Sequence, residues 1–336
     1  MYYVLFQCKD GLEYPECKLE EAMVNHTVST LLLTGFGEAG SSLSCLYFAL
    51  TLVAFLLTVF VNLVLIVLIY LKQNLHQPMY VFLCSLCING LYGSLALYPT
   101  LLNSFLSNPK VISLVGCLLQ MFLIDTYAGF ECTILSVMAY DRYVSICKPL
   151  QYHSIMTTSN ISILLFFAWL FPVCLFTVMV ALTSSLPLCG NTIEKVYCSN
   201  ASVVRLSCVD ASRERMYAIF VTLVIPCVPV LLVLLSYQKI LSVCLKASSD
   251  NRSKALNTCI PHIVTFVNYT GNIFFEVISY LLENTNVSFP VRSFMSLQLF
   301  IIPPLLNPIV YGIRLQEIRK TIVQIIYRGK IRSTFQ

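Results

Sequence analysis

Charged residues leave long apolar gaps along this chain of 336 residues. The windows without any Asp, Glu, Lys or Arg are 39–71, 73–109, 149–193, 216–238, 255–275 and 293–313. A seventh apolar stretch, 117–140, contains only Asp125 and Glu131 as charged residues. A helix needs about 20 apolar residues to cross a bilayer. The pattern therefore predicts seven transmembrane helices, near 45–70, 79–103, 117–142, 159–182, 215–240, 256–281 and 293–312.

The composition excludes several classes of protein. Apolar residues make up 57% of the chain and charged residues only 11%, with a mean hydropathy of +0.79. Such a chain is neither disordered nor collagen-like, and it is not expected to bind nucleic acid. We expect an all-α membrane protein in which a seven-helix bundle at 45–312 is flanked by tails at 1–44 and 313–336.

Basic residues are divided unevenly between the two sides of the predicted membrane. One side holds 13 of the 21 Lys and Arg residues against three acids, which predicts by the positive-inside rule that this side is cytoplasmic. The N-terminal tail then lies outside, where residues 1–22 lack helical or strand periodicity and are expected to be flexible. On the inner side, a short amphipathic helix on the membrane lipid is predicted after the seventh span from Lys320, Arg328, Lys330 and Arg332, which lie among isoleucines.

Sequons and several cysteines fall on the predicted outer side. Asn25, Asn200 and Asn286 face outward and could carry glycans, but only Asn25 has a roomy and flexible setting. Six of the 15 cysteines also lie outside: Cys8, Cys17, Cys117, Cys189, Cys198 and Cys208. The last three share a loop between spans four and five, which has little core of its own, so we expect disulfides to order it.

A specific motif stands at the predicted inner end of span three, where residues 138–150 read MAYDRYVSICKPL. Further motifs follow in matching order: LHQPMY at 75–80, SY at 236–237, KALNTC at 254–259 and PLLNPIVY at 304–311. With these motifs, the chain from about residue 25 to its end resembles the olfactory receptors, a branch of the rhodopsin-like G-protein-coupled receptors. The stretch NGLYG at 89–93 looks most like members from fishes.

The resemblance implies a receptor in the plasma membrane, with its C-terminus in the cytoplasm. It would bind a small waterborne odorant within the bundle and activate a heterotrimeric G protein of the stimulatory olfactory type, raising cAMP. No enzymatic activity and no cofactor are implied. The resemblance also implies a disulfide from Cys117 to Cys198, which leaves Cys189 to pair with Cys208.

The residues that the resemblance assigns to coupling and switching are Asp141, Arg142, Tyr143, Tyr237, Asn307, Pro308 and Tyr311. Arg142 is expected to pair with Asp141 at rest and to contact the G protein once released. Tyr237 and Tyr311 would then hold it through their hydroxyls. Pro308 kinks the seventh span by removing a backbone hydrogen bond, and Asn307 can supply replacement bonds.

Glu131 lies deep in the third span, where a carboxylate needs a partner or a proton. Gly90 stands where most rhodopsin-like receptors carry an Asp, so Glu131 is the nearby carboxylate that remains. It could bind Na⁺ together with Asn62, Asn89 or Asn307, or it could stay protonated and hydrogen-bonded. The residues leave both alternatives open, and no other metal site is expected.

Asp125 lies roughly 12 Å into the third span, at the depth where rhodopsin-like receptors hold small ligands. By helical spacing it shares a face with Ala128 and Gly129, whose small side chains leave room for a ligand. Phe274 and Glu276, in the outer half of span six, could approach the same cavity. Alternatively, the two acids bond to neighbouring helices.

Other functions fit the chain less well. A chemosensory G-protein-coupled receptor outside olfaction is the nearest alternative. A secondary transporter normally shows repeated halves with matching broken helices, and no such repeat is found. The four histidines are too scattered for a zinc enzyme, and His262 could be either a pH-sensitive switch or a hydrogen-bonded packing residue.

Overall fold

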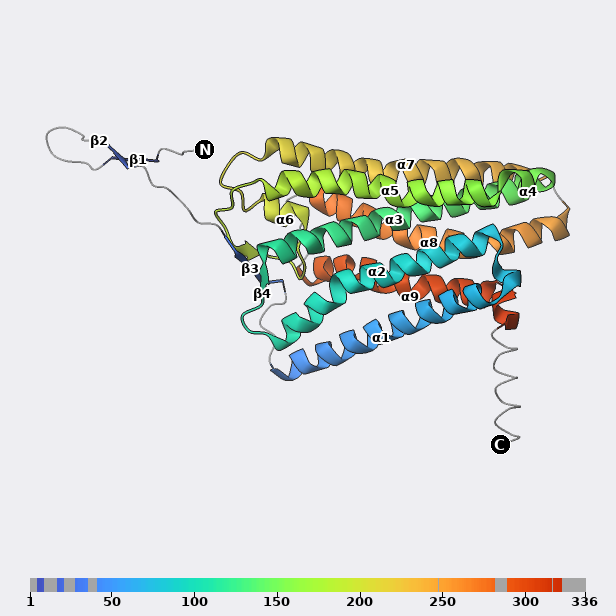
Figure 1. Ribbon diagram of the computed structural model, residues 1–336, viewed down its shortest axis with the longest axis horizontal. Coiled ribbons are helices and arrows are strands. Elements are labelled where there is room, and N and C mark those ends of the chain that lie inside the picture. The colour runs from blue at the N-terminus through green and yellow to red at the C-terminus, as the bar shows by residue number, and fades with distance from the viewer. Residues whose placement is uncertain are drawn as a thin grey trace.

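The computed structural model describes residues 5–8, 17–20, 28–35, 41–246, 248–281, 289–315 and 317–321. Within these ranges seven long helices run side by side in one bundle (Figure 1). They are α1 (Ser41–Leu71), α2 (Pro78–Leu106), α3 (Leu114–Cys147), α5 (Thr158–Ser184), α7 (Ser212–Cys244), α8 (Ser249–Leu281) and α9 (Phe289–Arg314). The predicted helical bundle is confirmed, and most helices extend a few residues beyond the predicted limits.

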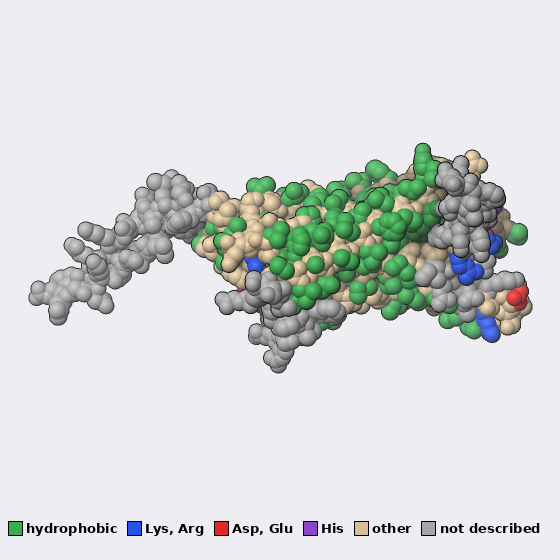
Figure 2. Space-filling view, turned by 90° about the horizontal axis from the view of Figure 1, so that it is seen from below, with side chains coloured by type: hydrophobic (Ala, Val, Ile, Leu, Met, Phe, Trp, Pro, Cys, Tyr) green, Lys and Arg blue, Asp and Glu red, His purple; other side chains and the backbone are tan. Residues whose placement is uncertain are grey.

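The surface of the bundle is suited to lipid. In the described part of the chain, five helices, α1, α2, α3, α5 and α7, are long and apolar enough to cross a membrane, and α9 holds the shorter apolar segment Leu297–Gly312. Large apolar side chains such as Leu50, Phe60 and Phe166 are more than half exposed, and hydrophobic side chains cover the middle of the molecule (Figure 2). Exposed apolar area of this extent marks an interaction surface. In a multi-pass membrane protein this surface contacts the lipid.

Helix α3 lies at the centre of the bundle and packs against α2, α5, α7 and α8. Its buried face carries polar as well as apolar side chains, including Gln120, Glu131 and Asp141. Lipid offers no hydrogen-bond partners, so such groups must find them inside the protein. Helix α3 carries Asp125, Glu131 and the Asp141–Arg142 pair, which belong to three of the four sites described below.

Short strands cover one end of the bundle, called here the disulfide end. A small sheet has the order β4 (Val111–Ser113), β3 (Thr30–Leu33), β5 (Thr192–Ile193), with β3 antiparallel to β4 and parallel to β5. Beside it lies the one-turn helix α6 (Asn200–Val204). The sheet connects the N-terminal segment to the loop between α5 and α7.

Two short strands occur within residues 1–22, although the sequence there shows no strand periodicity. The flexibility expected of this segment stays a prediction. Strands β1 (Leu5–Cys8) and β2 (Cys17–Glu20) pair antiparallel in a hairpin that projects from the bundle (Figure 1). Each strand has four residues, which is too short for a period of two to stand out in the sequence. Asn25 and Asn286 lie outside the described residues.

The opposite end, called here the Arg142 end, has short helical connections: η1 (Gln73–Leu75), η2 (Pro149–Gln151) and α4 (Tyr152–Ile155). After α9, residues 317–321 are helical, with Ile318 buried and Arg319 and Lys320 exposed. Lys320 donates to Glu317 over 2.9 Å, and this bond lowers the pKa of the Glu317 carboxyl. Arg328, Lys330 and Arg332 of the predicted amphipathic helix lie outside the described residues.

Candidate functional site

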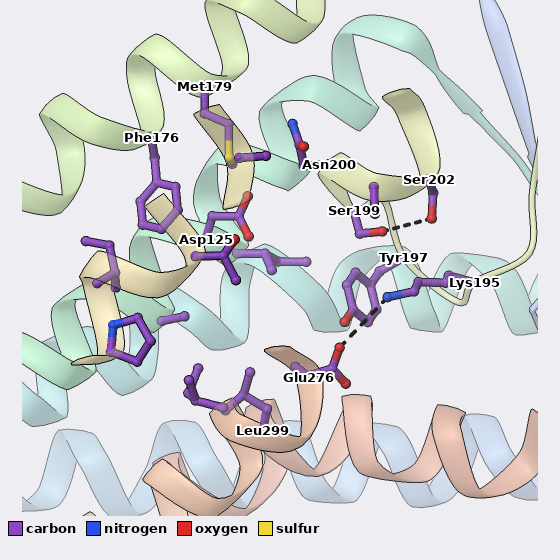
Figure 3. Close-up of a pocket in the computed structure, with 18 of the residues that line it drawn as sticks. Asp125, Phe176, Met179, Lys195, Tyr197, Ser199, Asn200, Ser202, Glu276 and Leu299 are labelled. Atoms are coloured by element: carbon purple, nitrogen blue, oxygen red, sulfur yellow. Dashed lines mark hydrogen bonds and ion pairs between the residues drawn. The ribbon is translucent and has the colours of Figure 1, made fainter. Parts of the chain in front are cut away.

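A cavity of about 200 Å³ lies within the bundle near the disulfide end. Helices α3, α5, α7, α8 and α9 supply its walls, and the loop that carries α6 supplies further residues (Figure 3). Phe176, Met179 and Ile225 give it an apolar side. The combination of apolar walls with a few convergent polar groups is typical of small-molecule sites.

Asp125 and Ala128 line this cavity from α3, as the helical spacing predicts. The Asp125 Oδ2 atom is buried and has no hydrogen-bond partner among the described residues. Gly129 does not line the cavity, because it faces α5 instead: a Cβ atom on Gly129 would lie 2.6 Å from Cβ of Pro172. Its missing side chain serves close helix packing rather than ligand space.

On α8, Glu276 lines the cavity but Phe274 does not. Ile273 occupies the cavity wall one residue earlier, and a single step along a helix turns the side chain by about 100°. Glu276 lies 3.9 Å from the Lys195 ammonium, measured from Oε2 to Nζ. The acid from span six therefore faces a cation supplied by the protein itself.

The loop between α5 and α7 contributes residues that the sequence did not point to. Lys195, Tyr197 and Asn200 all line the cavity, and the Lys195 ammonium also lies 5.6 Å from the centre of the Tyr197 ring. A loop of this kind has no periodicity that would reveal which side chains point inward. Only the cysteines signalled that the loop is held in place.

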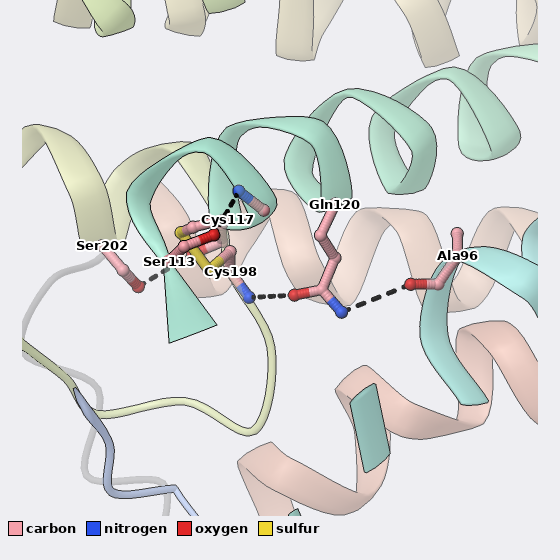
Figure 4. Close-up of a disulfide and its surroundings, with 8 residues drawn as sticks. Ala96, Ser113, Cys117, Gln120, Cys198 and Ser202 are labelled. Carbon is pink, nitrogen blue, oxygen red and sulfur yellow. Dashed lines mark hydrogen bonds between the residues drawn. A yellow bond between two sulfur atoms is a disulfide. The ribbon is translucent and has the colours of Figure 1, made fainter. Parts of the chain in front are cut away.

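Two disulfides hold that loop, joining Cys117 to Cys198 and Cys189 to Cys208. Beside the first, the backbone N–H of Cys198 donates to Gln120 Oε1 over 3.0 Å (Figure 4). Gln120 Nε2 in turn donates to the carbonyl of Ala96 over 3.3 Å. The buried Gln120 thus ties the loop to both α3 and α2.

Asn200 points into the protein and not outward as predicted from its sequon. Its Nδ2 atom, the atom that would carry a glycan, donates to Thr183 Oγ1 over 2.7 Å. Its Oδ1 atom is buried without a hydrogen-bond partner among the described residues. The sequence showed the motif, but only the fold shows that the side chain belongs to the cavity wall.

Glu131 lies at the centre of a second polar cluster, deeper in the bundle. Its Oε2 accepts from Asn89 Nδ2 over 2.8 Å and its Oε1 accepts from Asn307 Nδ2 over 2.6 Å. Both oxygens that would bind Na⁺ therefore already have donors. These two bonds fit the hydrogen-bonded alternative, and Na⁺ binding stays a prediction.

Asn62 stands beside this cluster but bonds elsewhere. Its Nδ2 donates over 2.8 Å to the carbonyls of both Thr58 and Pro304. The second carbonyl lies on α9, four residues before Pro308, whose ring leaves that carbonyl without its helical donor. Asn62 therefore compensates for the proline in the seventh span, a role that the sequence motif predicts for Asn307.

The third cluster contains the buried ion pair Asp141–Arg142 at the Arg142 end. The Arg142 guanidinium donates through Nε and Nη2 to Asp141 Oδ2. The other carboxylate oxygen accepts from the Tyr152 hydroxyl over 2.8 Å. Burial, then the nearby Asp141 carboxylate, raises the pKa of Tyr152, so Tyr152 stays protonated and able to donate.

The fourth cluster joins three helices around His262. Its Nε2 lies 2.7 Å from the Leu135 carbonyl and its Nδ1 lies 2.8 Å from the Tyr237 hydroxyl. A carbonyl only accepts, so Nε2 carries the proton and Nδ1 accepts from Tyr237. Tyr311 lies within 3.4 Å of Thr265 Oγ1. Neither tyrosine bonds to Arg142 in this arrangement.

Tyr143 belongs to the same end of the bundle. It packs with Tyr237 against a small apolar cluster of Ile240, Cys244 and Cys259. This contact joins α3 to α7 and α8 beside the Asp141–Arg142 pair. Asp141, Arg142, Tyr143 and Tyr237 therefore lie together at one end, and Arg142 is about 25 Å along α3 from Asp125 at 1.5 Å per residue. Asn307, which was predicted to act with them, lies deeper in the bundle at Glu131.

Comparison with known proteins shows relatives along nearly the whole chain. The family model described as olfactory receptor matches residues 50–329. Human olfactory receptor 10A3 is 34% identical over 310 residues, covering 92% of this chain and 98% of the relative. Human olfactory receptor 10A6 is 34% identical over 309 residues, covering 91% and 97%, and human olfactory receptor 13F1 is 36% identical over 293 residues, covering 86% and 90%.

Proposed function

Because the chain belongs to the olfactory receptor family, we propose that it binds a small waterborne odorant in the cavity beside Asp125. Binding would activate a heterotrimeric G protein of the stimulatory olfactory type and so raise cAMP. The proposal rests on one observation: helix α3 lines the cavity near one of its ends and carries the Asp141–Arg142 pair near the other. The likeness of residues 89–93 to fish members stays a prediction.

The contacts between the cavity and the Arg142 end suggest how a ligand acts. Tyr269 of α8 donates to the carbonyl of Ala128, a cavity residue, over 2.6 Å. Further along the same two helices, His262 donates to the carbonyl of Leu135. A ligand that displaces α3 relative to α8 would strain both bonds. Separation of the helices near His262 would also free Tyr237 from its bond.

Release of Arg142 is the final step in this proposal. A buried arginine needs its carboxylate partner, because an uncompensated buried charge is costly. Opening of the Arg142 end to water and to the G protein would supply new partners, so the Asp141 pair could break. In this proposal the disulfide end lies outside the cell and the Arg142 end lies in the cytoplasm of a plasma membrane receptor.

The test uses the full chain expressed in cells with a cAMP reporter and an antibody stain for surface receptor. A panel of water-soluble odorants should include at least one that raises cAMP in a dose-dependent manner. The Arg142→Ala variant, matched for surface level, serves as the control that should remain silent. A response that persists undiminished in Arg142→Ala would contradict the coupling mechanism.

A further inference from the structure

Two residues that line the same cavity each have one buried acceptor atom without a hydrogen-bond partner among the described residues. One is Oδ2 of Asp125 on α3, and the other is Oδ1 of Asn200 on α6. Figure 3 shows the two side chains on the cavity wall, with the Asp125 carboxylate directed towards the side on which Asn200 lies. Buried polar atoms in native proteins are nearly always hydrogen-bonded, so this pair indicates a missing donor.

We propose that the ligand is a small primary aliphatic amine whose ammonium group donates to both Asp125 and Asn200. An ammonium has three N–H donors and no acceptor, which matches two acceptors that lack donors. Its charge also compensates the charge of the buried Asp125 carboxylate. A neutral donor such as an alcohol forms a weaker hydrogen bond to a carboxylate than an ammonium does. The inference rests on the proposed function only in taking this cavity as the ligand site.

The other charged residues of the cavity do not compete for the ammonium. Glu276 already faces Lys195, with 3.9 Å between Oε2 and Nζ, so the two charges offset each other. Arg205, the remaining charged lining residue, is itself a cation and does not bind an ammonium. The second cavity contact to the ammonium is therefore Asn200 and not Glu276.

The rest of the cavity selects an apolar body for the ligand. Phe176 and Met179 of α5 and Ile225 of α7 form a continuous part of its lining. An alkyl chain against these side chains is stabilised by the area that it removes from water. A linear amine such as hexylamine combines this chain with the ammonium head.

Ligand binding is measured as the thermal stabilisation of the purified full-length receptor in detergent, which requires no G protein. Three probes share one chain: hexylamine, hexan-1-ol, and hexyltrimethylammonium, which keeps the charge but has no N–H donor. Hexylamine should stabilise the receptor at concentrations at least about 10-fold lower than either of the others. Equal stabilisation by hexan-1-ol would overturn the proposal, and equal stabilisation by hexyltrimethylammonium would overturn the bridging hydrogen bonds.

Variants assign the effect to the two acceptors. Asp125→Asn should weaken hexylamine by about 30-fold or more, because a buried charge loses its partner, and should leave hexan-1-ol nearly unchanged. Asn200→Asp should strengthen hexylamine binding, because it adds a carboxylate oxygen, and the Thr183 hydroxyl can turn from the Met179 carbonyl to donate to that carboxylate. Equal losses for both probes in Asp125→Asn, or no gain in Asn200→Asp, would overturn the proposal.

Two controls separate this inference from the rest. Ser202→Ala destroys the sequon but leaves Asn200 in place, and hexylamine binding should persist in it. If hexylamine stabilises the purified receptor but raises no cAMP in cells, the ligand class stands and the proposed coupling fails. If other odorants raise cAMP while hexylamine neither binds nor signals, the function stands and the ligand class fails.

Discussion

Asn307 of α9 donates a hydrogen bond of 2.6 Å to Oε1 of Glu131 on α3. Asn89 of α2 donates to the second oxygen of the same carboxyl group over 2.8 Å, so one side chain connects three helices. Asn89 is fully buried and Asn307 is 3% exposed, so neither amide can turn to solvent if the Glu131 carboxyl group is removed. The Glu131 cluster therefore holds α2, α3 and α9 together.

Glu131→Ala should therefore destabilise the receptor, by about 1–3 kcal/mol for each amide N–H that loses its acceptor, while Asn89 keeps its bond of 3.2 Å to the Tyr127 carbonyl. The melting temperature of the purified receptor measures this effect. Glu131→Gln should cost less, because one carbonyl oxygen remains to accept from one of the two amides.

We expect the melting temperature of the unmodified receptor to be the same in NaCl and in choline chloride, and a rise specific to Na⁺ would show cation binding instead.

The two disulfides should differ in their contribution to stability. Cys117 and Cys198 are 81 residues apart, whereas Cys189 and Cys208 are 19 apart. Closure of the longer loop removes more entropy from the unfolded chain. Because this effect grows with the logarithm of the loop length, the Cys117–Cys198 disulfide should stabilise the receptor by about 1 kcal/mol more than the other. Cys117→Ser should therefore reduce surface delivery more than Cys189→Ser, as measured by antibody staining of unpermeabilised cells. Equal surface levels would contradict this order.

Tyr152 should restrain the receptor in its resting state. Its hydroxyl donates to the Asp141 oxygen that Arg142 does not use, and loss of that bond costs about 1.5–3 kcal/mol for a charged acceptor. Tyr152→Phe keeps the ring and should raise cAMP without any odorant. His153→Phe, a change to the neighbouring exposed side chain, serves as the control, and an equal rise in both variants would show that the loop as a whole responds.

Gly35 should be needed for the position of the cavity loop. A Cβ atom on Gly35 would collide with the backbone of Lys195, a cavity residue, and backbone cannot turn aside as a flexible side chain can. Gly35→Ala should lower stability by about 1–3 kcal/mol and weaken odorant responses. Gly271→Ala is the matched control, because a Cβ atom there meets nothing within 4 Å, and its melting temperature should not fall.

The sequence by itself determined the helical membrane bundle. Lipid offers no hydrogen-bond partners to the backbone, so each span must be a helix that satisfies its own backbone groups. The side chains of such a helix are mostly apolar, so the spans are visible in the sequence as windows without charged residues. The same reasoning identified Asp125 and Glu131, because a carboxylate is conspicuous in an apolar span. The motifs around Arg142 identified the family through residues close together in the chain.

The tertiary structure decided which side chains meet across helices and loops. Helical spacing placed Gly129 beside Asp125, but packing against α5 uses that face for Pro172. Asn200 reads as an exposed sequon, and only the loop that Cys117–Cys198 holds in place turns it into the cavity wall. Such contacts depend on the rotation of each helix and the path of each loop, which arise from packing between segments far apart in the chain.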